Sequence, residues 1–194
     1  MTVRLAFIRH GHTAWNRAHK IQGSTDIPLD DEAREGLAAL RLPDPWASIN
    51  LWSSPLSRAR ETAELISGTS PQIASELTEM NWGDWEGLHG KDLLADPSSG
   101  YRNLEDWGWD FTPPNGESPA DVRDRLRPWL HRQTEDGVVV AHMGTMRAAL
   151  ALAHGWDFTG PCPFTIKRNR LFVIEGQGDT WTAWPDPIRL EKRT

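Results

Sequence analysis

Three short apolar segments of the chain are each followed directly by polar residues. The first, residues 3–8, is β-branched at both ends and runs into an arginine and His10. The second, residues 49–52, precedes a pair of serines, and the third, residues 137–141, contains three consecutive valines and precedes His142. Short apolar runs that end in a loop are typical of buried strands. The pattern therefore predicts strands with polar side chains at their carboxyl ends.

Helices are predicted between these strands. A serine N-cap followed by a proline in the first helical position predicts a helix over residues 55–66, with Arg58 in its first turns. A second helix is predicted to begin after Ser118, because four apolar positions that follow it share one face. A stretch rich in alanine and leucine after His142 predicts a third helix that reaches Ala153. The apolar positions of the second helix are Val122, Leu126, Trp129 and Leu130.

The end of the chain predicts a hairpin, whereas one middle segment has no regular pattern. Residues 171–174 and 180–184 read as antiparallel strands joined by a turn at 176–179. Residues 88–115 are rich in Pro, Ser, Gly and Trp without a clear period, which indicates an irregular insertion. Strands that alternate with helices predict an α/β three-layer sandwich with a mostly parallel central sheet and an antiparallel edge. We expect one domain over residues 1–194.

Composition excludes several classes of partner. The chain has 21 Lys and Arg against 27 Asp and Glu, a net charge of −6, which disfavours partners bound through nonspecific attraction to phosphate groups. Its single cysteine, Cys162, cannot form a disulfide within the chain, and this fits a reducing cytoplasm. The longest apolar stretches are too short to span a bilayer. We expect a cytoplasmic protein without a nucleic-acid or membrane partner; its oligomeric state is not predicted.

Cationic and imidazole side chains follow the predicted strands. Ligands of parallel sheets bind at the carboxyl ends of the strands, and this rule places Arg9, His10, Arg58 and His142 at one rim. In a protein of net negative charge, two arginines and two histidines at a shared rim describe a positive pocket suited to a phosphate or a carboxylate.

The segment around His10 resembles a known family. Arg9-His10-Gly11-His12-Thr13 with Asn16 is similar to the R-H-G-x-T-x-x-N signature of the histidine phosphatase superfamily, the phosphoglycerate mutase-like proteins. Further blocks follow in the family's order and cover most of the chain, and the resemblance implies a phosphoglycerate mutase-like fold. These blocks are Gln22-Gly23, Asp26 with Pro28-Leu29, residues 54–59 with Thr62-Ala63, Leu77, Glu79, Gly83, residues 85–87, residues 113–118 and residues 139–142.

The resemblance implies a covalent mechanism. A neutral imidazole has one free ring nitrogen and is available at neutral pH as a nucleophile toward phosphorus. His10 would become a phosphohistidine, while Arg9 and Arg58 hold the phosphoryl oxygens and His142 and Asn16 complete the cradle. Backbone amides of the helix after His142 are expected to add donors to the anion. No metal ion and no cofactor is expected.

Two glutamates that follow the helix predicted over residues 55–66 are candidates for roles in the site. Glu79 is the candidate general acid for the leaving oxygen and then the base for the water that hydrolyses phosphohistidine. Its place in the family pattern selects it over the neighbouring Glu76 and Asp84. Glu86 is interpreted as structural, pairing with a cation behind the pocket.

The chain departs from the family pattern at two positions. His12 stands where an acidic or amide residue is common, and we interpret it as support for the loop. Where the family usually has a glycine after the distal histidine, Met143 precedes Gly144 and is expected to project a side chain near the pocket. Together with Gln22 and Gly23, Met143 is an expected substrate contact.

Metal-dependent hydrolysis is an alternative within enzymes. His10-x-His12 in an extended segment is a known metal-ligand spacing, and His142 and Asp26 could complete such a site. Against it, two arginines would lie beside the cation, and no cluster of carboxylates supports the ligands. Phosphohistidine chemistry, in contrast, should survive chelators.

Thiol chemistry and pure binding are further alternatives. Cys162 and Arg168 have the Cys-x5-Arg spacing of thiol phosphatases, but the residues between them lack the glycines of a phosphate-binding loop, and a buried structural thiol is favoured. A silent module that binds a phosphorylated partner would not need both His10 and Glu79. The basic residues 167–170 are interpreted as a solvated sheet edge.

Hydrolysis is favoured over the mutase reaction. Residues 80–84 lack the extra basic residues of mutases and resemble the phosphatase branch of the superfamily, including alpha-ribazole phosphatase-like proteins. We therefore expect a metal-independent phosphatase that acts on a small phosphorylated metabolite. Trp82, Trp107 and Trp109 either stack on a sugar or base of that substrate or pack the irregular insertion.

Overall fold

The computed structural model describes residues 2–193. No helix within that range is long and apolar enough to cross a bilayer. Its helices are α1 (Ala14–Arg17), α2 (Asp31–Ala38), α3 (Ser57–Ser67), α4 (Gly90–Ala95), α5 (Pro119–His131) and α6 (Met143–His154), with 3₁₀ helices at Trp46–Ser48, Ser75–Leu77, Gly83–Trp85 and Pro97–Ser99. Its strands are β1 (Val3–Arg9), β2 (Leu40–Arg41), β3 (Asn50–Ser53), β4 (Gln72–Ile73), β5 (Gly137–Ala141), β6 (Arg170–Gln177), β7 (Thr180–Ala183), β8 (Ile188–Arg189) and β9 (Glu191–Lys192).

The central sheet is mixed, and most of its strands are parallel. The strand order is β4-β3-β5-β1-β6-β7, with β8 paired to β6. Strand β5 lies between β3 and β1 and is parallel to both, and β4 is parallel to β3. Strand β6 runs antiparallel to β1, and β7 antiparallel to β6. The predicted parallel sheet with an antiparallel edge is confirmed.

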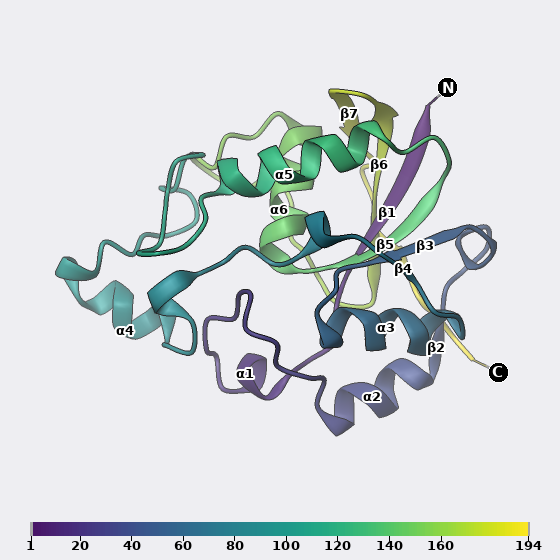
Figure 1. Ribbon diagram of the computed structural model, residues 1–194, viewed down its shortest axis with the longest axis horizontal. Helices are drawn as coiled ribbons and strands as arrows, with labels where there is room; N and C mark the ends of the chain where they lie inside the picture. The colour runs from purple at the N-terminus through teal and green to yellow at the C-terminus, as the bar shows by residue number, and fades with distance from the viewer. Residues whose placement is uncertain (1, 194) are drawn as a thin grey trace.

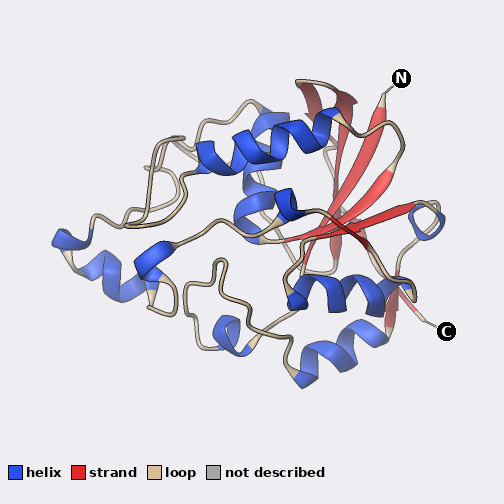
Figure 2. Ribbon diagram, in the orientation of Figure 1, coloured by secondary structure: helices blue, strands red, loops and turns tan. Residues whose placement is uncertain are grey.

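Helices cover both faces of this sheet. Figures 1 and 2 show α5 and α6 on one side of the strands and α2 and α3 on the other. The two faces follow from the alternation of side chains along β1, because Leu5 and Phe7 join one apolar cluster while Ala6 and Ile8 join the other. The predicted three-layer arrangement is confirmed.

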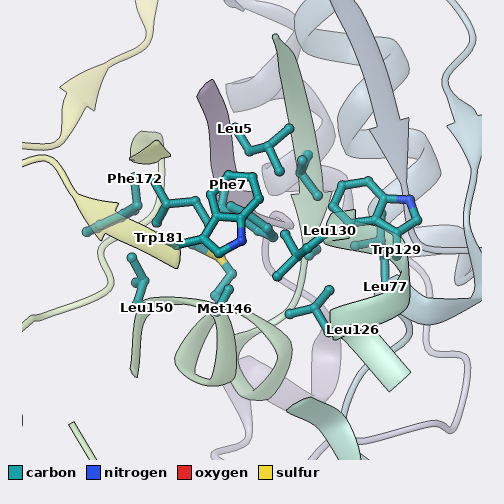
Figure 3. Packing of buried hydrophobic residues seen from close by; sticks show 14 of the residues in the cluster. Leu5, Phe7, Leu77, Leu126, Trp129, Leu130, Met146, Leu150, Phe172 and Trp181 are labelled. Carbon is teal, nitrogen blue, oxygen red and sulfur yellow. The ribbon is translucent and has the colours of Figure 1, made fainter. Parts of the chain in front are cut away.

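The face covered by α5 and α6 holds a dense apolar core. Figure 3 shows Met146 and Leu150 of α6 beside Phe7 of β1 and Trp181 of β7. Full burial of such side chains stabilises a fold by about 1.5–3 kcal/mol each. This packing holds α6, and with it the loop at His142, against the end of β1.

Helix α3 begins later than its sequence predicts. The Oγ of Ser54 accepts a hydrogen bond from Leu56 N at 3.2 Å, which closes a turn before the helix instead of capping it. The first helical residue is Ser57, whose backbone N donates to the Asp26 carboxylate at 2.9 Å. The predicted start at Pro55 is therefore wrong, because a carboxylate distant in sequence satisfies the N-terminus of the helix.

The other predicted elements form close to their expected bounds. Ser118 caps α5 through a capping box with Asp121, and α6 follows His142 directly. The terminal hairpin is also present, although β6 continues to Gln177, so the turn between the strands is shorter than predicted. The two strands therefore pair over more residues than the extent of their apolar runs predicts.

The segment 88–115 is irregular except for α4 and the 3₁₀ helix at Pro97–Ser99. Its aromatic side chains form a third apolar cluster with residues from α5, α6 and the loop after α6. Trp107 stacks on Phe111 at a ring-centroid distance of 4.8 Å and faces Phe158 at 6.0 Å. Aromatic packing therefore anchors a segment that has little regular hydrogen bonding.

Candidate active site

The ends of β1 and β5 bring two histidines together. Arg9 pairs with Ala141 in the parallel ladder, and the backbone N of His10 donates to the Ala141 carbonyl at 3.0 Å. The rings of His10 and His142 consequently lie 5.0 Å apart, centroid to centroid. The sheet thus places at one rim two residues that are far apart in sequence.

The surroundings of His10 define its charge and its tautomer. Its Nδ1 lies 2.6 Å from the Gly11 carbonyl oxygen, and because a carbonyl only accepts, we assign the proton to Nδ1. Nε2 then carries the lone pair. Burial lowers the pKa of His10 well below its ordinary value, and the positive charges of Arg58, Arg9 and Arg168 and the nearby His142 lower it further. His10 is therefore a neutral imidazole with one nucleophilic nitrogen.

Arg58 is completely buried and is held by a loop. Its Nη1 donates to the Thr25 carbonyl at 2.9 Å and its Nη2 to the Gly23 carbonyl at 2.7 Å. Burial lowers the pKa of Arg58. These two bonds fix the direction of the guanidinium, whose charge acts on both His10 and His142.

Glu86 forms hydrogen bonds with the same loop, residues 23–25. Its carboxylate accepts hydrogen bonds from the backbone N atoms of Ser24, Thr25 and Trp82 and from the hydroxyls of Ser24 and Thr25. The structural role predicted for Glu86 agrees with these contacts, but the direct cation partner does not. Its charge acts on Arg58 only from a distance.

Glu79 is buried, with 4% of its surface exposed. Its carboxylate accepts hydrogen bonds from Met80 N at 2.8 Å, Gly144 N at 2.9 Å and Thr145 N at 3.2 Å. The amides at the start of α6, which the sequence predicted would hold a bound anion, therefore hold this carboxylate. The segment after β4 folds across the N-terminus of α6 and occupies the Gly144 and Thr145 amides, so of these donors only the Met143 amide stays a predicted donor to the anion.

A cavity of about 690 Å³ opens over these groups. Six of the predicted site residues line it, and three lie behind its wall. Arg58 and His142 are fully buried, and Gly23 contributes only its carbonyl to Arg58. Those that line the cavity are Arg9, His10, Asn16, Gln22, Glu79 and Met143, and His12 joins them.

Three buried polar atoms near His10 have no hydrogen-bond partner within residues 2–193. They are both ring nitrogens of His142 and Nε of Arg9. Burial lowers the pKa of His142 well below its ordinary value, and that of Arg9 to about 10. Buried polar groups without partners cost free energy, and an arginine fork matches phosphoryl oxygens. This part of the rim therefore favours an anionic ligand.

Arg168 is a site residue that the sequence reasoning missed. Its Nε donates to the His10 carbonyl at 3.2 Å and its Nη2 to the Asn16 Oδ1 at 2.9 Å, and it lines the cavity. Burial and the charge of Arg9 lower its pKa to about 9. Its interpretation as part of a solvated edge is wrong, since the turn before β6 directs it inward. No local pattern distinguishes it from its basic neighbours.

Of the residues of the rival mechanisms, His12 and His142 lie near His10, whereas Cys162 and Asp26 do not join them. The Cys162 thiol donates to the Phe164 carbonyl, packs in the aromatic cluster and does not line the cavity. Asp26 caps α3 and lies 3.9 Å from the Arg58 guanidinium. Within residues 2–193, no three His, Cys, Asp or Glu side chains are grouped as ligands for a metal.

The three tryptophans considered as substrate contacts, Trp82, Trp107 and Trp109, differ in whether they line the cavity. Trp82 and Trp107 line the cavity and contact each other at a centroid distance of 5.4 Å. Trp109 does not line it and packs against Phe158 at 4.9 Å. Only the first two are placed to meet a ligand.

Comparison with known proteins places these features in a family. Residues 5–184 match the profile of the histidine phosphatase superfamily (branch 1). A glucosyl-3-phosphoglycerate phosphatase of Mycolicibacterium vanbaalenii is 33% identical over 157 residues, which are 78% of this chain and 69% of that protein. An acid phosphatase of Mycobacterium tuberculosis is 30% identical over 95% of this chain and 96% of its own length.

Solved structures of similar proteins superpose on nearly the whole chain. A putative alpha-ribazole-5'-P phosphatase of Escherichia coli superposes with a TM-score of 0.76 at 25% identity, over 97% of this chain and 96% of that one. The protein TTHB049 of Thermus thermophilus superposes with a TM-score of 0.72 at 32% identity, over 98% of this chain and 100% of that one.

Proposed function

Because the chain belongs to the histidine phosphatase superfamily, branch 1, we propose that it hydrolyses phosphomonoesters of small metabolites through a phosphohistidine on His10. The observation that carries the proposal is the state of His10, which is neutral, bonded through Nδ1 to Gly11 and surrounded by arginines. Relatives named as phosphatases support hydrolysis.

The first step transfers the phosphoryl group to the protein. Nε2 of His10 attacks phosphorus, the N–P bond forms and the P–O bond to the alcohol breaks. Glu79 in its protonated form gives its proton to the leaving oxygen, so that the first product departs as a neutral alcohol. Glu79 lines the same cavity as His10, which supports this role.

The second step returns the protein to its starting state. Glu79, now ionised, takes a proton from a water molecule whose oxygen attacks phosphorus. The N–P bond breaks, inorganic phosphate forms and His10 regains its lone pair. The backbone amides of Gly144 and Thr145 hold the carboxylate in place between the two steps.

The cations stabilise the charge that moves between the two oxygens and Nε2. Arg9, Arg58 and Arg168 supply guanidinium groups around His10, and His142 supplies a second imidazole. Fixed donors aimed at developing charge are worth about 2.7–4 kcal/mol each in other enzymes. The arrangement needs no metal ion for this purpose.

Turnover is favoured over silent binding, because recognition of a phosphate needs the arginines but not a carboxylate beside the nucleophile. Hydrolysis is also favoured over the mutase reaction, although a phosphoglycerate mutase-like protein of Arabidopsis thaliana is 30% identical over 97% of this chain and 87% of its own length. We further propose that the protein works in the cytoplasm, since its one cysteine is a free thiol.

The test is trapping of the intermediate. The protein is mixed with a ³²P-labelled phosphomonoester in the presence of a chelator, quenched in alkali and digested. We expect acid-labile label on the peptide that contains His10, and release of inorganic phosphate. His10→Ala removes both, whereas the control His131→Ala, an exposed histidine that contacts Asp179, retains both. Label on another residue, or activity that depends on a metal, contradicts the proposal.

A further inference from the structure

The cavity carries more positive charge than a single phosphoryl group needs. Of the charged side chains that line it, six are cationic and one, Glu79, is acidic, in a chain whose net charge is −6. Arg9 and Arg168, with Arg58 behind the wall, already surround His10. The remaining cations that line it are Lys20, Lys91, Arg102 and Arg147, and the part of the cavity that they line is called its outer part below.

Arg147 is the best placed of these four. It lies on α6, one turn beyond Met143 and Gly144, which also line the cavity. Its guanidinium carbon is 5.7 Å from the centroid of the Trp107 ring. Arg147 affects the pKa of Arg9, whereas the charges acting on His10 come from other groups. It therefore lines the cavity next to Trp107.

Arg147 also has no anion in contact with its guanidinium. It forms no hydrogen bond or ion pair with the described part of the chain; burial lowers its pKa, and the charge of Glu79 acts in the opposite direction without a direct contact. Arg123 provides the contrast, because its guanidinium lies over the Trp109 ring at 5.0 Å and donates to the Asp124 carboxylate at 2.7 Å. A partly desolvated guanidinium without a directly paired anion is costly, and an anionic ligand group offsets that cost.

Several other lining residues of the outer part come from the irregular segment 88–115. Lys91 and Leu94 of α4 are three residues apart and share a face of that helix, and Arg102 follows further along. Figure 1 shows α4 on the side of the molecule away from the sheet. Tyr101 and Trp107 line the space with aromatic surface.

We propose that the outer part of the cavity binds a second anionic group of the substrate. The preferred substrates are then phosphomonoesters of about sugar-phosphate size that carry a carboxylate or a second phosphate at the end away from the reacting ester. A cavity of about 690 Å³ has room for such molecules. The inference rests on the proposed function, since it assigns the reacting phosphate to His10.

Matched substrates test the proposal. Glucitol 6-phosphate, 6-phosphogluconate and glucitol 1,6-bisphosphate share a six-carbon chain and differ at C1, which carries a hydroxyl, a carboxylate or a phosphate. We expect kcat/KM for either charged member to exceed that for glucitol 6-phosphate by at least about tenfold, mainly through a lower KM. The two charged members distinguish a carboxylate from a phosphate as the preferred group.

Substitution of Arg147 locates the effect. In Arg147→Gln, kcat/KM for the charged members is expected to fall by about tenfold more than kcat/KM for glucitol 6-phosphate. Arg147→Lys retains the charge and restores part of the preference. The control Arg123→Gln removes the other arginine that stacks on a tryptophan, outside the cavity, and retains the full preference. Melting curves of each variant verify that it folds.

Binding separates this proposal from the proposed function. Calorimetric titration of His10→Ala with the same three compounds measures the preference without turnover. If the protein hydrolyses none of them but binds the charged members at least tenfold more tightly, the proposed function fails and the second anion site stands. Equal kcat/KM and equal affinity for all three, or a preference unchanged in Arg147→Gln, overturns the second anion site.

Discussion

The carboxylate of Glu79 and the backbone of Gly144 are in direct contact: Gly144 N donates to Oε1 at 2.9 Å, and a Cβ at position 144 would lie 2.6 Å from that oxygen and 2.8 Å from Met80 Cβ. Glycine at this position therefore permits the first turn of α6 to approach the proposed acid. Any side chain here must displace the carboxylate or the helix.

Gly144→Ala is expected to lower kcat by tenfold or more, because a small displacement of a proton donor is costly in rate. Steady-state kinetics with a phosphomonoester measures the effect. Gly36→Ala in α2 is the matched control, since its added Cβ meets nothing within 4 Å and should leave kcat unchanged. Equal kcat in both variants and the wild type would contradict the role of Glu79.

Arg168→Gln is expected to lower kcat/KM by about 10- to 100-fold, because it removes a cation beside the phosphoryl site and the bond to the His10 carbonyl. Arg170→Gln, two residues later, is the control, because the Arg170 side chain is half-buried, does not line the cavity and donates to Asn169 O. An unchanged kcat/KM in both variants would restore the interpretation of this basic segment as a solvated edge.

Glu86→Gln is expected to loosen the loop that holds Arg58. The substitution places amide N–H donors against the donors of Ser24 and Thr25, and loss of such bonds costs about 1–3 kcal/mol. We expect faster hydrogen exchange at residues 23–25 and a kcat/KM about tenfold lower. Glu76→Gln, which removes an ion pair with Arg132 away from the cavity, should change neither.

The pH dependence of activity follows from the lowered pKa of His10. An ordinary histidine becomes protonated below a pH of about 6.5 and stops acting as a nucleophile. His10 stays neutral below that pH, so kcat/KM should show no loss on the acid side centred at about pH 6.5. A pH profile of kcat/KM checks this, and a break with that midpoint would show that His10 titrates normally.

The free energy of unfolding, unlike kcat/KM, is expected to change below a pH of about 6.5. In the unfolded chain His10 and His142 take up protons near pH 6.5, whereas in the folded protein their lowered pKa values keep them neutral. The unfolded state then binds more protons, so the free energy of unfolding falls as the pH drops below about 6.5. Each histidine contributes a loss of at most about 1.4 kcal/mol per pH unit.

Urea unfolding of the wild type and His142→Gln between about pH 7 and pH 5 measures this slope. The variant should lose about half of the contribution that the two buried rings share, whatever its stability at pH 7. An identical slope in both proteins would mean that His142 is not held neutral by the fold.

The local sequence pattern was enough to predict most helices and strands and part of the candidate active site. Apolar runs with β-branched residues located β1 and β5, and the polar residue after each, Arg9–His10 and His142, follows from where those runs end. The rule that ligands bind at the carboxyl ends of parallel strands then brought these residues together. Such inferences work because side-chain periodicity and capping are properties of adjacent residues.

Tertiary structure decided the remaining features, because each of them depends on residues that only folding brings into contact. Asp26 caps α3 across the molecule, Glu79 occupies the amides of α6, and Arg168 points inward from a segment that resembles an exposed basic edge. The neutrality of His10 has the same origin. It arises from burial among arginines supplied by three separate segments, and no stretch of sequence contains that environment.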